Sequence, residues 1–120
     1  MYTEETFKNN VYSNNISTLS DSALLVRIFE NNDERAYEIL IDRYLQPLWR
    51  LASNILHDGS EAEDVIQDVF AMLWHRKLDW DSQGDAKFTS WIYRVVLNKC
   101  IDVKRKKQRQ ALSGKDIPES

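Results

Sequence analysis

The sequence predicts an all-α protein: a compact helical bundle of about four helices with flexible termini. The 120 residues contain only three Gly and two Pro, too few for the many turns of a β-sandwich or barrel. Apolar residues recur in steps of three and four along several segments, which is the spacing of one face of a helix. With 42% hydrophobic residues the chain can bury a core, and its length suits a single domain.

The N-terminal part of the chain predicts a tail followed by a short helix. Residues 1–19 are polar, rich in Asn and without a sustained period, so we expect a flexible tail. Ser20 and its neighbours can cap a helix that ends near Glu30. The apolar residues of this segment fall on one side of such a helix, namely Leu24, Leu25, Ile28 and Phe29.

A longer second helix is predicted from Glu34 to about His57, with Asp33 as its N-cap. Pro47 lies inside this segment and has no backbone donor, which predicts a kink near Arg43–Tyr44. Gly59 suits the left-handed conformation just past a helix C-terminus, so we expect it to end this helix.

A third helix is predicted to begin at Ser60 and to end near Arg76. Ser60 and Glu63 have the spacing of a capping box, in which each side chain accepts a hydrogen bond from the backbone of the other residue. The apolar residues that follow recur at helical spacing and are expected to be buried: Val65, Ile66, Val69, Phe70 and Leu73.

The C-terminal third predicts an acidic loop, a fourth helix and a tail. Residues 78–86 show no period and contain one Gly, so we expect a loop there. The fourth helix is predicted from Phe88 to Arg109, and Gly and Pro interrupt any pattern in residues 111–120.

The charge of the chain is divided unevenly along its length. The segment from Lys87 to Arg109 has eight basic residues and one acid, a net charge of +7, whereas the remainder has eight basic and 18 acidic residues, a net charge of −10. Such asymmetry is typical of a chain with one end that binds a polyanion. The alternative is a solvated basic helix without a partner.

Several classes of function are disfavoured by the sequence. No apolar run approaches the ~20 residues of a membrane span, and the N-terminus lacks the features of a secretory signal. We therefore expect a cytoplasmic protein that makes no membrane contact of its own. Cys100 is the single cysteine, so it forms no internal disulfide.

Catalysis also lacks support. His57 and His75 have no Cys, Ser or carboxylate at ligand spacing, and there is no glycine-rich phosphate loop. Asp64 and Asp68 share a helix face, but two carboxylates are far short of a metal coordination sphere. We therefore expect a binding protein without enzymatic activity, metal or cofactor.

One candidate binding surface lies on the predicted third helix. The spacing of Asp64, Gln67 and Asp68 places all three on one face. Trp74 follows close to three turns after Asp64, and an exposed Trp beside polar residues is typical of an interface hot spot. The alternative is that Trp74 packs inward and the acids only complement the helix N-terminus.

A second candidate surface lies where the acidic loop meets the basic helix. Aromatic and basic residues alternate there, which suits single-stranded nucleic acid, because bases stack on rings while cations meet phosphates. Along the helix, residues 94, 98, 102 and 105 form one polar stripe, which a solvent-exposed face would also explain. The residues involved are Trp80, Lys87, Phe88, Trp91, Tyr93, Arg94, Asn98, Lys99 and the run from Lys104 to Lys107.

Three motifs together resemble region 2 of bacterial sigma-70 family factors, above all the extracytoplasmic-function subgroup. The first is Leu40-x-x-Arg-Tyr44, and the second is Ala62-Glu-Asp-Val-Ile-Gln-Asp-Val-Phe70 followed by Leu73-Trp74. The third is Phe88-x-x-Trp-Ile-Tyr-Arg94 with Asn98 and Asp102-x-x-Arg105. They occur in the family's order and cover about residues 20–109.

The resemblance implies a helical bundle that binds core RNA polymerase. In the family, the helix with the Ala-Glu-Asp motif docks on the coiled coil of the β′ subunit. Carried over to this chain, that helix would place four residues at polymerase: Asp64, Gln67, Asp68 and Trp74. An anti-sigma factor is a further partner that the resemblance allows.

The resemblance also implies binding to the non-template single strand of the promoter −10 element. In the family, the loop and the start of the next helix hold a base flipped out of the DNA, and the basic turns meet phosphates. The corresponding residues here are Trp80, Asp85, Lys87, Phe88, Arg94, Asn98, Lys99, Lys104, Arg105 and Lys106.

This chain departs from the family pattern in two ways. Its loop 78–86 is slightly longer, so the base pocket is not placed residue by residue. The −35-reading domain is absent, which predicts a region 2 domain at residues 20–110, the start of an inter-domain linker at 111–120, and an excised domain or an unusually short protein. A polymerase-associated interaction module and a generic DNA-binding domain without promoter melting are the alternative functions.

Overall fold

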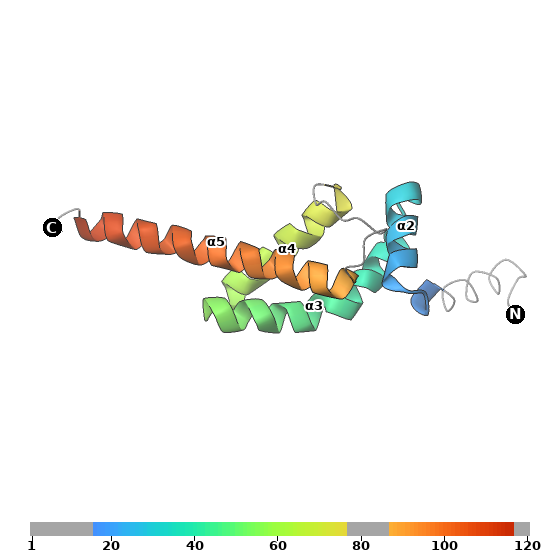
Figure 1. The fold of residues 1–120 in the computed structure, drawn as a ribbon, viewed down its shortest axis with the longest axis horizontal. Coiled ribbons are helices and arrows are strands. Elements are labelled where there is room, and N and C mark those ends of the chain that lie inside the picture. The colour runs from blue at the N-terminus through green and yellow to red at the C-terminus, as the bar shows by residue number, and fades with distance from the viewer. Residues whose placement is uncertain (1–15, 77–86, 117–120) are drawn as a thin grey trace, which may run out of the picture.

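A computed structural model of the chain describes residues 16–76 and 87–116. These ranges contain four helices and no strand: α2 (Asp21–Asn31), α3 (Glu34–Leu56), α4 (Gly59–Trp74) and α5 (Phe88–Asp116) (Figure 1). The predicted all-α fold and the number of helices are confirmed. None of the helices in these ranges is long and apolar enough to cross a membrane.

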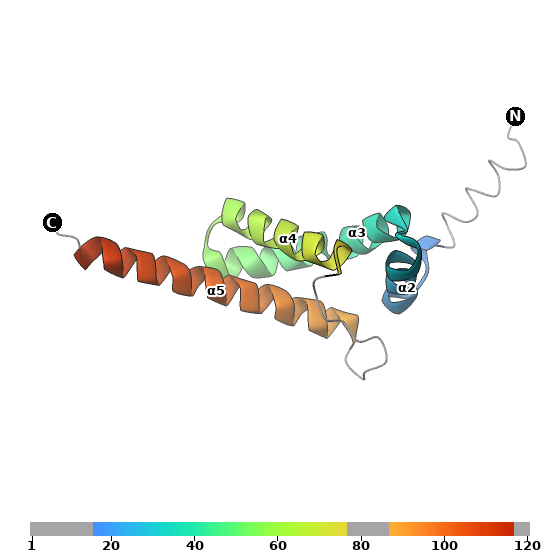
Figure 2. The ribbon, with the colours of Figure 1, turned by 90° about the horizontal axis from the view of Figure 1, so that it is seen from above.

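Helix α3 is the central element of the bundle. It contacts α2, α4 and α5, and it forms an antiparallel hairpin with α4. Helix α5 runs along this hairpin, and its C-terminal part extends past the other helices (Figures 1 and 2). Where α5 leaves the bundle, residues 104–112 are all exposed.

The core is formed where the apolar faces of the four helices meet. Ile16 also belongs to it with 9% of its surface exposed, although the sequence assigned this residue to the tail. The largest fully buried side chains come from every helix: Leu24, Leu25, Ile28, Leu40, Leu48, Ile66, Val69, Leu73, Ile92, Val96 and Cys100. Burial of this set accounts for the helical periods read from the sequence.

Two predicted N-caps are confirmed and one is wrong. The side chains of Ser20 and Asp33 accept hydrogen bonds from backbone amides in the first turns of α2 and α3. At α4 the cap is Asp58, whose carboxylate accepts from the amides of Ser60 at 2.9 Å and Glu61 at 3.0 Å. The capping box predicted at Ser60 does not form, because α4 begins earlier, at Gly59.

The turn between α3 and α4 also differs from the prediction. His57 and not Gly59 adopts the left-handed conformation, with φ of 55°, and its amide donates to the carbonyl of Ser53. Gly59 lies close to Trp49, and a Cβ atom there would be 3.2 Å from the Trp49 ring, so that a larger residue would require the ring to shift slightly. Proximity to this ring therefore explains the glycine better than backbone conformation does.

Pro47 lies inside one continuous helix, as expected, whereas α5 extends beyond its predicted end. Helix α3 remains continuous across Pro47, which is exposed on its surface. Helix α5 continues past the predicted end at Arg109 as far as Asp116 and includes Gly114. A single Gly lowers helix stability by only ~1 kcal/mol, so it need not end a helix.

Candidate functional site

The polar residues singled out in α4 lie together on its exposed side. Asp64, Gln67 and Asp68 are all exposed, and the opposite side of the helix is buried in the core. In the described part of the chain, no hydrogen bond or ion pair engages their side chains. The two carboxylates and the amide are therefore available to a partner.

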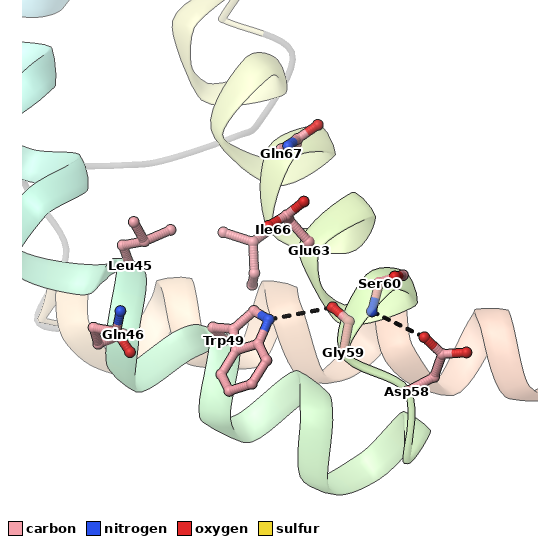
Figure 3. Close-up of a pocket in the computed structure, with 9 residues that line it drawn as sticks. All are labelled: Leu45, Gln46, Trp49, Asp58, Gly59, Ser60, Glu63, Ile66 and Gln67. Atoms are coloured by element: carbon pink, nitrogen blue, oxygen red, sulfur yellow. Dashed lines mark hydrogen bonds between the residues drawn. The ribbon is translucent and has the colours of Figure 1, made fainter.

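A cleft of about 820 Å³ lies beside this surface, between α3 and the N-terminal half of α4 (Figure 3). Leu45 and Trp49 line it from α3, and Glu63 and Gln67 line it from α4. The Trp49 indole N–H donates to the carbonyl of Gly59 at 3.2 Å, which fixes the ring at one end of the cleft. The cleft is thus lined by both apolar and polar side chains, since Gln46 also lines it from α3 and Ile66 from α4.

Trp74 lines a second hollow, of about 440 Å³, near the C-terminal end of α4. Its ring packs against Tyr37 with 4.9 Å between centroids, and the Tyr37 hydroxyl donates to the carbonyl of Phe70 at 2.7 Å. Burial raises the pKa of Tyr37, so this hydroxyl stays protonated and keeps donating. Trp74 is therefore half-buried, between the two alternatives that the sequence left open.

Helix α5 presents a basic and polar stripe opposite its buried side. Lys87, Arg94, Asn98 and Arg105 are exposed, and the positions of the first three repeat after seven and four residues, on one helix face. Lys104 and Lys106 are also exposed, whereas Lys99 is half-buried. Asn98 has no hydrogen bond to the bundle among the described residues, so its amide is open to a ligand.

Phe88, which the sequence predicts to contact DNA, is buried in the structure. Only 3% of its surface is exposed, because its ring lies against Tyr44, 5.3 Å between centroids, and against Trp91 at 5.6 Å. A base could stack on Phe88 only after the core had opened. Phe88 therefore packs the first turn of α5 onto the core, and its contact with DNA stays a prediction.

Comparison with known proteins agrees with this geometry. Residues 40–110 match the family model for sigma-70 region 2. The chain belongs to the sigma-70 family. Among its relatives, it is 35% identical over 98 residues to RNA polymerase sigma factor NccH of Alcaligenes xylosoxydans xylosoxydans, covering 80% of this chain and 52% of the relative.

A further relative places this region 2 in the extracytoplasmic-function (ECF) subgroup. The chain is 32% identical over 80 residues to the ECF RNA polymerase sigma-E factor of Escherichia coli K12, covering 67% of this chain and 40% of the relative. It is 31% identical over 78 residues to the RNA polymerase sigma-H factor of Pseudomonas aeruginosa, covering 65% and 39%. The chain thus spans about half the length of these relatives or less. No solved structure matches it at a significant level.

Two of the predicted DNA-binding residues of this region 2, Trp80 and Asp85, lie outside the described residues. The rest of the acidic loop from Leu78 to Ala86 lies outside them as well. The structure therefore describes the predicted DNA-binding surface from Lys87 onward.

Sequence reasoning missed two groups of residues in this region 2. Leu45 and Trp49 continue a stripe with Tyr37 and Ile41 in steps of four, so a second apolar row on α3 was the available signal. Lys107 bonds to both carboxylate oxygens of Glu61, at 3.1 and 3.0 Å. No local pattern indicates that pair, because its members are far apart in the sequence.

The described part of this region 2 holds no cluster of three or more His, Cys, Asp or Glu that could bind a metal. Cys100 is buried in the core, and burial raises the pKa of its thiol. A buried, protonated thiol is a poor nucleophile. Cys100 therefore serves packing.

Proposed function

We propose that this chain is the region 2 domain of a transcription initiation factor, which binds core RNA polymerase and recognises and melts the promoter −10 element. The observation that carries the proposal is the presence of two exposed surfaces of opposite charge on one small bundle. The α4 surface is acidic and lies beside a preformed cleft, while the α5 surface is basic and carries an exposed amide.

The polymerase-binding surface consists of Asp64, Gln67 and Asp68, with Trp74 at its edge. Its partner is the β′ coiled coil. A coiled coil offers a long, convex surface with charged side chains at its flanks, which suits an acidic helix beside a cleft of mixed apolar and polar lining. The half-buried Trp74 would add an apolar contact at one end.

The DNA-binding surface begins at Lys87 and follows α5 through Arg94 and Asn98 to the basic run, and Trp80 and Asp85 of the preceding loop are included in the proposal. Arg and Lys contacts to phosphates position a strand, whereas an amide can donate to and accept from a base edge. Asn98 is thus the described residue best suited to read sequence. The strand is the non-template one, from which a flipped base is captured, and such capture opens DNA without enzymatic turnover.

The proposal extends to the wider setting of the protein. It assigns residues 20–110 to the sigma domain and residues 111–120 to the start of a linker, although α5 remains helical across that boundary. The protein would act in the cytoplasm, where its DNA and polymerase are, and without enzymatic activity or a cofactor. An anti-sigma factor that covers the α4 surface is a further partner under this proposal.

The test is DNA binding by the full chain, measured by fluorescence with short oligonucleotides. A preferred sequence is first selected from a randomised single-stranded pool, and then each position is varied one base at a time. The chain should bind the selected strand better than its complement or the duplex. Asn98→Ala should change the ranking of bases at one position, by about 1–3 kcal/mol of discrimination, more than it changes overall affinity.

The other outcomes identify the alternative functions. Equal affinity for both strands and for the duplex would indicate a generic DNA-binding domain. Binding to a β′ coiled-coil fragment without any DNA binding would indicate an interaction module. A matched control is Asn54→Ala, which removes an exposed amide from α3, away from the basic stripe, and should leave base ranking unchanged.

A further inference from the structure

A chain of hydrogen bonds joins α2, α3 and the first turn of α5. The Tyr44 hydroxyl donates to the Asp21 carboxylate and lies 2.7 Å from the Thr89 hydroxyl. A tyrosine hydroxyl has one proton, so while Tyr44 donates to Asp21, Thr89 must donate to Tyr44. The direction of hydrogen-bond donation is therefore set, from Thr89 to Tyr44 and from Tyr44 to Asp21.

The carboxylate of Asp21, where this series of hydrogen bonds ends, is fixed by further contacts. The second oxygen of Asp21 accepts a hydrogen bond from Arg43 at 2.8 Å. Arg43 also donates to the carbonyls of Ser17, at 2.8 Å, and Leu19, at 2.6 Å. With both of its oxygens engaged, Asp21 has little freedom to turn away from Tyr44, which is only 8% exposed.

Tyr44 touches the beginning of α5 in two ways. Its ring meets the edge of Phe88, and its hydroxyl meets Thr89 in the next position. Thr89 lies on the side of the helix turned away from the stripe of Lys87, Arg94 and Asn98. A contact on one side of a helix fixes its rotation, so this pair of contacts determines where the stripe on the other side points.

We propose that Tyr44, oriented by Asp21, is a positioning residue that sets the rotation of α5 and so the base selectivity of its exposed stripe. The proposal rests on the DNA-binding function proposed above. Groups that read a base must be held within about 0.5 Å of the productive geometry, and that requires support from side chains behind them. The ring of Phe88 supplies packing that many rotations tolerate, whereas a hydrogen bond to Thr89 favours one.

The test compares Tyr44→Phe with Tyr37→Phe. Each variant removes one part-buried hydroxyl of α3. The Tyr44 hydroxyl makes hydrogen bonds with Asp21 and Thr89, whereas the Tyr37 hydroxyl bonds to α4, at the Phe70 carbonyl. Both variants should lower the melting temperature by a similar few degrees. Only Tyr44→Phe should reduce discrimination between the selected strand and its single-base variants, by about 3- to 10-fold.

Thr89 offers a second pair of variants that does not alter the core. Thr89→Val keeps the shape of the side chain without the hydroxyl, and it should reproduce the loss of base discrimination. Thr89→Ser keeps the hydroxyl, and it should retain the discrimination of the wild type. Binding to the β′ coiled-coil fragment should be unchanged in all of them. The proposal would be overturned if Tyr44→Phe and Tyr37→Phe had equal effects on base discrimination, or if Thr89→Val kept full discrimination. A wild-type chain without any base preference would instead overturn the proposed DNA-binding function.

Discussion

The α3–α4 hairpin and helix α5 present binding surfaces that are built in different ways. On the hairpin, two hollows and a row of exposed polar residues are shaped by packing along the whole length of both helices. On α5, the first half is packed into the core, and residues 104–112 are all exposed beyond it. The hairpin surface thus depends on shape, while the end of α5 depends on charge.

This contrast shows which residues are separable from the fold. Asp64, Gln67 and Asp68 project from the exposed side of α4, while its buried side packs into the core. The DNA-facing residues proposed at the start of α5 instead depend on Phe88 and Tyr44 directly beneath them. We therefore expect substitutions on the exposed side of α4 to weaken binding alone. Substitutions beneath the start of α5 should also lower stability.

The largest expected effect is a loss of stability when the Phe88 ring, which packs α5 onto the core, is removed. Phe88→Ala should lower the free energy of unfolding by about 3–5 kcal/mol, because it leaves a cavity beside Tyr44 and Trp91. Leu112→Ala is the matched control on the same helix, since 60% of Leu112 is exposed, and its effect should be within about 0.5 kcal/mol. Urea denaturation of both variants measures the difference. A mild effect of Phe88→Ala would show that α5 is not supported by this ring.

A smaller effect should appear on raising the pH. Burial and the hydrogen bond to Asp21 raise the pKa of Tyr44 to about 12. The folded state therefore holds this proton more tightly than the unfolded state, so its stabilising contribution is present below pH ~10 and is lost between pH ~10 and ~12. The loss amounts to at most roughly 2–3 kcal/mol. In Tyr44→Phe, denaturation curves across this range should shift less than in the wild type; equal shifts would mean that other groups cause the loss.

On the hairpin, substitutions should weaken binding to polymerase without lowering the stability of the fold. Asp64→Ala combined with Gln67→Ala should weaken binding to core polymerase by about 2 kcal/mol or more, as expected for residues at the centre of an interface. The free energy of unfolding should change by no more than about 0.5 kcal/mol per substitution, because both side chains are exposed. Co-purification with polymerase and thermal denaturation test the two statements. A collapse of the thermal transition would show instead that these residues are structural.

The smallest effects are expected at the exposed end of α5. Replacing Lys104, Arg105 and Lys106 by Gln should weaken binding to all single strands alike and flatten the salt dependence by about 0.7 per lost phosphate contact. Lys107→Gln is the comparison, because Lys107 bonds to Glu61 within the chain. That half-exposed pair should contribute at most about 1 kcal/mol to stability. An unchanged salt dependence in the triple variant would mean that the run only solubilises the helix.

The sequence alone determined the class and order of the elements. Helical periods, the caps at Ser20 and Asp33, and the division of charge between the acidic part and α5 all depend on residues close together in the chain. For the same reason the exposed face of Asp64, Gln67 and Asp68 followed directly from their spacing. The family motifs are local as well, because each of the three lies within a single helix.

Only the tertiary structure decided the surroundings of individual side chains and their contacts with other helices. Phe88 is buried while Arg94, on the same helix, is exposed, and Gly59 lies close to the ring of Trp49. The bonds from Tyr44 to Asp21 and Thr89, like the ion pair of Lys107 with Glu61, join positions 23, 45 and 46 residues apart. Such contacts depend on how whole helices pack against one another, and a period of 3.6 residues within one helix carries no information about its neighbour.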